Sequence, residues 1–299
     1  MSATDAGRRN AGIAFVVVSA VAFGAMAILA RFAFASGVDT ATLLALRFTI
    51  AAVVMTMLVR ARDLSVPRGS TLGMLIALGA LGYGGQAICY FTALRLAPAG
   101  LAALLLYLHP ALVAVLAAVF LRERLSAAKL AALAIALAGT TLTVAPAIGE
   151  GAIAAAPQVA TGLAFAVASA AFYAVYIVVA AAIGPRTAPL PMTMVVTASA
   201  AAVFVAAAVL GGPQWPQTAA GWLAIVAIAL LSTVMAITLY FAGLERIGPV
   251  RAATLSTVEP LCAVVLAALV LDEAIAPVQL AGGVLILVAA VLIARARSA

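Results

Sequence analysis

The chain has 299 residues, of which 67% are hydrophobic and only 8% are charged, and its mean hydropathy is +1.28. A soluble domain of this length has too little interior to bury so much apolar surface, so the composition excludes a soluble globular fold and indicates membrane spans. The formal net charge of +7 does not indicate a nucleic-acid partner, because the basic residues gather between apolar runs and describe membrane topology.

Apolar runs long enough to cross a bilayer follow one another from end to end of the chain. A helical span needs roughly 20 apolar residues. The runs are rich in alanine and leucine and lack strand-like alternation, which favours helices over a β-barrel. The predicted spans are 11–35, 41–60, 70–94, 99–121, 127–146, 160–183, 190–211, 220–243, 249–271 and 276–294. The expected fold is therefore an all-α integral membrane protein with ten transmembrane helices.

The second half of the chain repeats the first at an offset of 150 residues. The stretch 106–110 ends in His-Pro, and the equivalent stretch 256–260 ends in Glu-Pro. Other matches at this offset are Gly12 with Gly162, Tyr90 with Tyr240, and Glu123 with Glu273. We therefore predict two five-helix repeats, 1–150 and 151–299, within one transmembrane domain. Because five is odd, the second repeat enters the membrane from the opposite side.

Basic residues indicate the orientation, because lysine and arginine are enriched in cytoplasmic loops. If the spans alternate, nearly all basic residues fall on one side: Arg8, Arg9, Arg60, Arg62, Arg68, Arg122, Arg124, Lys129, Arg186, Arg246, Arg251, Arg295 and Arg297. The repeat-equivalent loops lose these charges, since Arg122-Glu123-Arg124 becomes Asp272-Glu273-Ala274. Both termini are thus predicted to be cytoplasmic. The longest loop, Ala145 to Ala160, lies on the other side and is predicted to link the repeats.

Short motifs recur along the chain in a specific order. Leu94 to Ala99, Leu108-His109-Pro110 and Leu121 to Leu125 are followed by Gly243 to Pro249, Glu259-Pro260, Leu271 to Glu273 and Gln279 to Gly283. In this order and spacing they resemble the drug/metabolite transporter superfamily, EamA type. Arg47 matches the arginine that this family tends to carry in its second span. The resemblance covers Gly12 to about Ala294 and implies a ten-helix metabolite exporter of the cytoplasmic (inner) membrane, often moving amino acids.

Polar residues at helical spacing predict the substrate site. Inverted repeats of secondary transporters place their sites near the bilayer centre, and intramembrane polar groups face the bundle interior. The predicted substrate-binding residues are Ser19, Phe23, Tyr83, Gln86, Tyr90, Tyr107, His109, Ser169, Tyr173, Tyr176, Ser232, Tyr240, Ser256 and Glu259. They would line a cavity between the first, third, fourth, sixth, eighth and ninth spans. Aromatic and hydroxyl groups suit a small zwitterion, because rings contact apolar parts and their faces attract ammonium.

Several of these residues have a structural alternative. Tyrosines and serines at helical spacing also serve helix packing, and Tyr90 and Tyr240 could belong to an aromatic belt at the membrane surface. His109 and Glu259 either contact the amine of the solute, relay a proton, or form hydrogen-bonded structural pairs. Arg47 is expected either to reach outward to the membrane surface or to pair with a helix C-terminus. Arg31, Asp39 and Arg95 are expected to form an external rim, and Glu123 and Glu273 are expected to make structural pairs near loops.

Other functional classes lack their sequence signals. There is one histidine, no His-Glu-x-x-His, no Gly-x-Ser-x-Gly and no phosphate-binding Gly-rich loop, so neither an intramembrane enzyme nor an ATP-driven pump is predicted. No catalytic residue, metal or cofactor is expected, and Cys89 and Cys262 are read as packing residues. The fifth and tenth spans have the composition of helix-packing or dimer-contact surfaces, which leaves a homodimer open. Export of cationic drugs or other toxic small molecules remains the alternative to amino-acid export.

Overall fold

The structure is a computed structural model that describes residues 3–120, 127–149, 157–183, 188–247, 255–256 and 258–295. Within these ranges the chain is helical and contains no strand. The helices are α1 (Ala3–Ala35), α2 (Thr40–Ala61), α3 (Gly69–Ala77), α4 (Gly84–Leu96), α5 (Ala99–Leu106), α6 (His109–Phe120), α7 (Ala127–Gly149), α9 (Pro157–Ile183), α10 (Pro189–Gly211), α11 (Ala219–Ala229), α12 (Ala236–Ile247), α14 (Val258–Leu271) and α15 (Pro277–Arg295). Two π-helical turns, η1 (Leu78–Tyr83) and η3 (Leu230–Met235), join α3 to α4 and α11 to α12.

These helices account for the ten predicted spans. Six are apolar and long enough to cross a membrane, and four shorter apolar helices occupy the remaining positions. The expectation of a multi-pass all-α membrane protein is therefore confirmed. The fourth span is broken at Tyr107, between α5 and α6, one turn before Pro110. The expected linker is shorter than predicted, because α7 continues to Gly149 and α9 already begins at Pro157.

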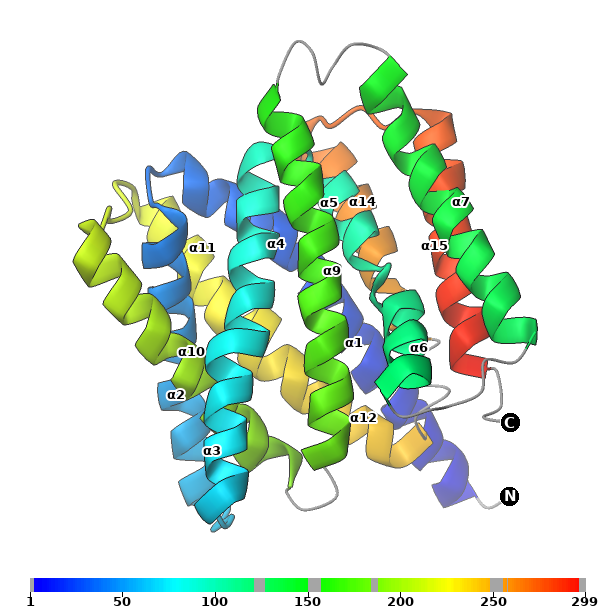
Figure 1. The fold of residues 1–299 in the computed structure, drawn as a ribbon. Coiled ribbons are helices and arrows are strands. Elements are labelled where there is room, and N and C mark those ends of the chain that lie inside the picture. The colour runs from blue at the N-terminus through cyan, green and yellow to red at the C-terminus, as the bar shows by residue number, and fades with distance from the viewer. Residues whose placement is uncertain are drawn as a thin grey trace.

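The packing of the helices repeats the symmetry of the sequence. α2 lies along α10 and α7 lies along α15, and both pairs join equivalent helices of the two halves. α1 packs against α12 and α14, while its counterpart α9 packs against α4, α5 and α6. Figure 1 shows α7 and α15 together at one edge of the bundle, with α9 and α1 nearer its middle. The two repeats thus interlock and share one interior.

Two equivalent glycines allow a close helix contact at matching places in the two repeats. A Cβ atom on Gly12 would lie 2.6 Å from Ile247 Cγ2, and one on Gly162 would lie 2.8 Å from Ala97 Cβ. Ile247 and Ala97 are themselves related by the 150-residue offset. The same contact therefore occurs twice, each time between the two halves, and it needs glycine because a larger residue would push the neighbouring segments apart.

We expect Gly162→Ala to lower the free energy of unfolding by about 1–3 kcal/mol, because the new methyl group overpacks a contact that also involves the Ala97 backbone nitrogen, 2.9 Å away. Gly73→Ala is the matched control, since nothing lies within 4 Å of its added Cβ. That variant should be neutral or slightly stabilised, because alanine favours helix over glycine. Thermal unfolding of both purified variants checks this, and equal midpoints would contradict the packing argument.

The two ends of the bundle differ in charge. α1 begins, and α15 ends, on the side where α2 passes into α3 (Figure 1). We call this side the basic face, and it carries Arg9, Arg60, Arg62, Arg68 and Arg246. The other side, which we call the opposite face, holds the connections from α1 to α2, from α4 to α5, and from α14 to α15.

Asp39 organises one corner of the opposite face. Its carboxylate caps α2 by accepting a hydrogen bond from the Thr42 backbone nitrogen at 3.0 Å, and it accepts another from the Gln214 backbone nitrogen, also at 3.0 Å. Burial raises the pKa of this carboxyl, but its hydrogen bonds, led by the one from the Thr42 side chain, outweigh burial and hold the pKa below its usual value. Asp39 is therefore a structural cap joining the two halves of the chain.

Candidate functional site

A line of touching aromatic rings crosses the interior between helices of both repeats. Ring centroids are 5.5 Å apart for Tyr83 and Tyr176, 6.0 Å for Tyr176 and Tyr173, 4.7 Å for Tyr173 and His109, and 5.4 Å for His109 and Tyr107. We call these five residues the aromatic chain. It runs from the end of η1 across α9 to the break between α5 and α6. Sequence positions up to 93 residues apart are thus brought into one continuous surface.

Glu259 closes one end of the aromatic chain. The Tyr107 hydroxyl lies 3.0 Å from Glu259 Oε2 and 2.8 Å from the Ser256 carbonyl oxygen. The carboxylate also interacts electrostatically with Tyr90, Tyr173 and Tyr240. Within the described part of the chain no basic side chain lies within ion-pair distance of Glu259. A carboxylate surrounded by phenols, without a cation, is the group in this interior best suited to attract one.

His109 is held by the end of α5, the helix that precedes its own. Its Nδ1 atom lies 3.0 Å from the Leu106 carbonyl oxygen, and because a carbonyl only accepts, Nδ1 carries the proton. The bond fixes the imidazole between Tyr107 and Tyr173. His109 thus has one committed nitrogen and serves first as a ring within the aromatic chain.

Arg47 closes the other end, which corrects our expectation for this residue. It neither reaches the membrane surface nor pairs with a helix C-terminus: its side chain points inward and is only 3% exposed. Its Nε donates to Thr233 Oγ1 at 3.1 Å, and its Nη2 lies 3.4 Å from the Tyr83 hydroxyl. The guanidinium also lies 5.1 Å from the Phe91 ring centroid. The inward direction of Arg47 is thus what the sequence reasoning missed.

The two hydrogen-bond partners of Arg47 are equivalent residues of the two repeats, and each lies in a π-helical turn. Tyr83 ends η1 and Thr233 lies within η3, and the two residues are 150 apart in sequence. π-helical turns occur mostly at functional sites, because the extra residue disrupts the regular helix. One guanidinium therefore joins the irregular turns of both repeats.

The other predicted residues are divided between the site and structural bonds. Gln86 and Ser169 bond to each other across α4 and α9, with Gln86 Nε2 3.2 Å from Ser169 Oγ. Ser19 donates to the Ala236 carbonyl oxygen at 2.7 Å and so ties α1 to α12. The Ser232 hydroxyl is fully buried and finds no hydrogen-bond partner among the described residues. Phe23 lies partly buried on α1. Substrate contact by all fourteen residues stays a prediction.

A cluster around Glu273 lies on the opposite face. This carboxylate accepts the backbone N–H groups of Ala99 at 2.8 Å and Gly100 at 3.1 Å, which begin α5. Arg31 lies 3.7 Å from the same carboxylate and donates to the Leu94 carbonyl oxygen at 3.0 Å, near the end of α4. Glu273 is thus a structural pair, as expected, whereas its repeat mate Glu123 lies outside the described residues.

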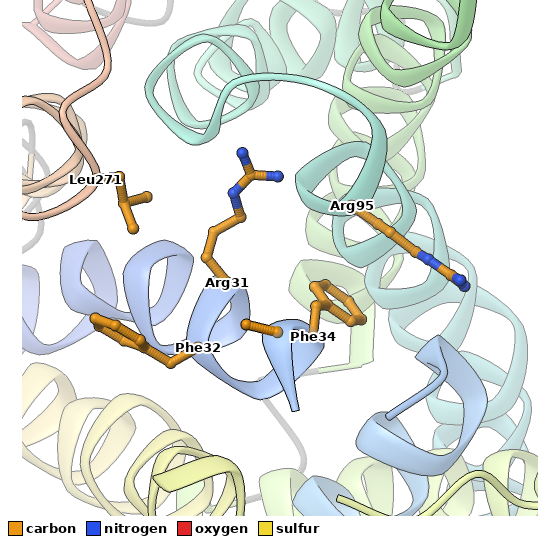
Figure 2. Close-up of a pocket in the computed structure, with 6 residues that line it drawn as sticks. Arg31, Phe32, Phe34, Arg95 and Leu271 are labelled. Carbon is orange, nitrogen blue, oxygen red and sulfur yellow. The ribbon is translucent and has the colours of Figure 1, made fainter. Parts of the chain in front are cut away.

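A cavity of about 370 Å³ lies beside this cluster, lined by Arg31, Phe32, Phe34, Ala35, Arg95 and Leu271. Figure 2 shows the Arg31 and Arg95 side chains pointing in different directions, so they do not combine into one basic site. Arg31 pairs with Glu273 and Asp39 caps α2, while Arg31 and Arg95 line the same cavity, so the expected rim of Arg31, Asp39 and Arg95 stays a prediction. A second cavity, of about 330 Å³, lies between α14 and α15 and is apolar. Neither cavity is lined by the aromatic chain.

A metal or disulfide site has no support in the part of the chain that the structure describes. No group of three or more histidine, cysteine, aspartate or glutamate side chains there could hold a metal ion. Cys89 is buried and Cys262 partly buried, and both are free thiols. The site thus consists of aromatic rings, hydroxyls, one carboxylate and one guanidinium.

The model of the EamA-like transporter family matches residues 10–145 and again residues 160–295, one match for each repeat. The chain belongs to the EamA-like transporter family. An uncharacterized transporter of Archaeoglobus fulgidus is 28% identical over 285 residues, which cover 95% of this chain and 96% of that protein. A solved crystal structure superposes with a TM-score of 0.66 at 26% identity, covering 95% of this chain and 96% of that one. The double match to the EamA family coincides with the repeats derived from the sequence, and the protein is a membrane transporter.

Proposed function

We propose that the protein is a secondary transporter of the cytoplasmic membrane that exports small metabolites, chiefly amino acids, with broad selectivity and by alternating access. The observation that carries this proposal is the aromatic chain ending at Glu259. Tyrosine rings offer apolar contact and hydroxyls without selecting one side-chain shape, and Glu259 offers one negative charge for an ammonium group. A solute with an amine and a variable side chain fits this chemistry.

The proposed orientation places the basic face in the cytoplasm. Arginines gather there in the connection between α2 and α3 and near the start of α1, as lysine and arginine do in cytoplasmic loops. Both termini then lie in the cytoplasm. The inverted repeats support alternating access, because two similar halves of opposite orientation give inward-open and outward-open states of comparable free energy.

Uptake into proteoliposomes tests the proposal. Purified protein is reconstituted with unlabelled amino acid inside, and the entry of labelled amino acid is measured for a panel of apolar, aromatic and polar amino acids, with and without a proton gradient. We expect counterflow of several amino acids and weaker transport of cationic drugs. Transport of cationic drugs alone would favour the alternative of drug export, and transport of a single amino acid would contradict broad selectivity.

A further inference from the structure

Arg47 is a buried cation whose protein partners are all neutral. Its two hydrogen-bonded partners are the hydroxyls of Thr233 and Tyr83, and its ring neighbours are Phe48 and Phe91. No carboxylate of the described residues lies within ion-pair distance of Arg47. A guanidinium has five N–H donors, and these two bonds use two of them. A charge buried without an opposite charge is costly, so this site favours the arrival of an anion.

The position of Arg47 joins this cation to the proposed amine site. Arg47 and Glu259 occupy opposite ends of the aromatic chain, at Tyr83 and at Tyr107 respectively. The interior thus offers one group of each sign, in contact with the same set of rings.

We propose that Arg47 binds the carboxylate of the transported solute. This inference rests on the proposed function and narrows its solutes to zwitterions of amino-acid or dipeptide size. The planar guanidinium can bind both oxygens of a carboxylate at once. A cationic drug without a carboxylate would leave Arg47 unpaired.

Removing one charge from the solute tests this directly. Binding to the purified protein in lipid nanodiscs is measured by calorimetry for two pairs of probes: L-leucine with L-leucinamide, and leucyl-leucine with leucyl-leucinamide. We expect the wild-type protein to bind the acid of at least one pair roughly tenfold or more tightly than the amide. Arg47→Gln should bring that ratio close to one by weakening the acid and leaving the amide within about twofold.

Two further variants separate carboxylate binding from a structural role. Thr233→Val removes a protein partner of Arg47 but keeps the guanidinium, so its acid-to-amide ratio should stay close to that of the wild type. Arg47→Lys keeps the charge but loses the planar fork, so the ratio should fall part of the way and gives the answer if Arg47→Gln does not fold. A wild-type protein without acid preference, or a ratio unchanged in the Arg47 variants, would overturn the inference.

The same protein separates this inference from the proposed function. Preferential binding of the acid that depends on Arg47, without uptake into proteoliposomes, would support the binding site and overturn transport of these solutes. Uptake of amino acids with equal binding of acid and amide would support transport and overturn the role of Arg47.

Discussion

Glu259→Gln is expected to lower the initial rate of amino-acid transport by about tenfold or more while the protein still inserts and purifies normally. Glutamine has nearly the same shape, and its amide oxygen can still accept the hydrogen bond that the Tyr107 hydroxyl makes at 3.0 Å. The substitution therefore removes the charge and its titration with little change in packing. A tenfold loss corresponds to about 1.4 kcal/mol, which is well within the range for one charge-assisted contact to an ammonium group.

His109→Gln is the matched comparison, because His109 is the repeat mate of Glu259 and lies in the same aromatic chain. We expect a milder loss, since His109 already donates to the Leu106 carbonyl oxygen and carries no obligatory charge. The measurement is the initial transport rate of each variant at matched protein level between about pH 5.5 and 8. If the Glu259 carboxylate titrates during transport, the rate of the wild type should depend on pH, and this dependence should vanish in Glu259→Gln. Wild-type rates and pH dependence in that variant would mean that the carboxylate is only structural.

The helices could be predicted from the sequence because a membrane restricts which structures can span it. Every span must satisfy its own backbone hydrogen bonds in the lipid, so length and hydropathy suffice to locate helices. The 150-residue offset then predicts which helices of the two halves are equivalent. The matching contacts of Gly12 and Gly162 show this equivalence in the structure. Each end of α2 and α10 lies within one residue of the end of its predicted span.

The candidate site was only partly predictable. Helical spacing identified the polar faces, but it could not place Tyr83 in line with Tyr173 and Tyr176, because that depends on how η1 and α9 cross. The inward direction of Arg47 was missed for a physical reason: near a helix end, an arginine has a cheaper alternative at the membrane surface. Its actual partners lie 36 and 186 residues away, on two π-helical turns that hydropathy does not reveal.

A difference between the two repeats could have indicated that Arg47 points inward. The equivalent position in the second half is Thr197, whose hydroxyl bonds within its own helix to the Thr193 carbonyl oxygen at 2.8 Å. A charged residue inside a span is costly in lipid. When it occurs in one repeat and not at the equivalent position of the other, the shared fold does not require it, so it indicates a function. The same comparison also sets Glu259 against His109, so the departures from symmetry coincide with the two charges of the site.

Glu273→Ala is expected to lower the free energy of unfolding by about 2–3 kcal/mol, because it leaves two N–H groups at the start of α5 and the Arg31 guanidinium without their carboxylate. Most of this loss comes from the helix cap, since Arg31 is partly exposed and its ion pair is screened by solvent. Thermal unfolding of the purified protein gives the measurement. Asp272→Asn is the matched control, because this exposed neighbour carries the same charge, and asparagine tolerates its positive φ of 52°.

Glu273 could contribute only to stability, or it could also hold the opposite face closed during transport. Measuring exchange rates of its variants distinguishes these two roles. Glu273 lies in the second repeat, while Ala99, Gly100 and Arg31 belong to the first, so this carboxylate joins the halves that must separate when the opposite face opens. A double-mutant cycle compares Arg31→Ala, Glu273→Ala and the double variant. If the two residues are coupled, the losses of unfolding free energy in the single variants should sum to more than the loss in the double variant. Additive losses in unfolding free energy and wild-type exchange rates in all three would mean that the cluster does not hold this face closed. Coupled losses in stability with altered exchange rates would place the opening of the opposite face at the contact between Glu273 and the start of α5.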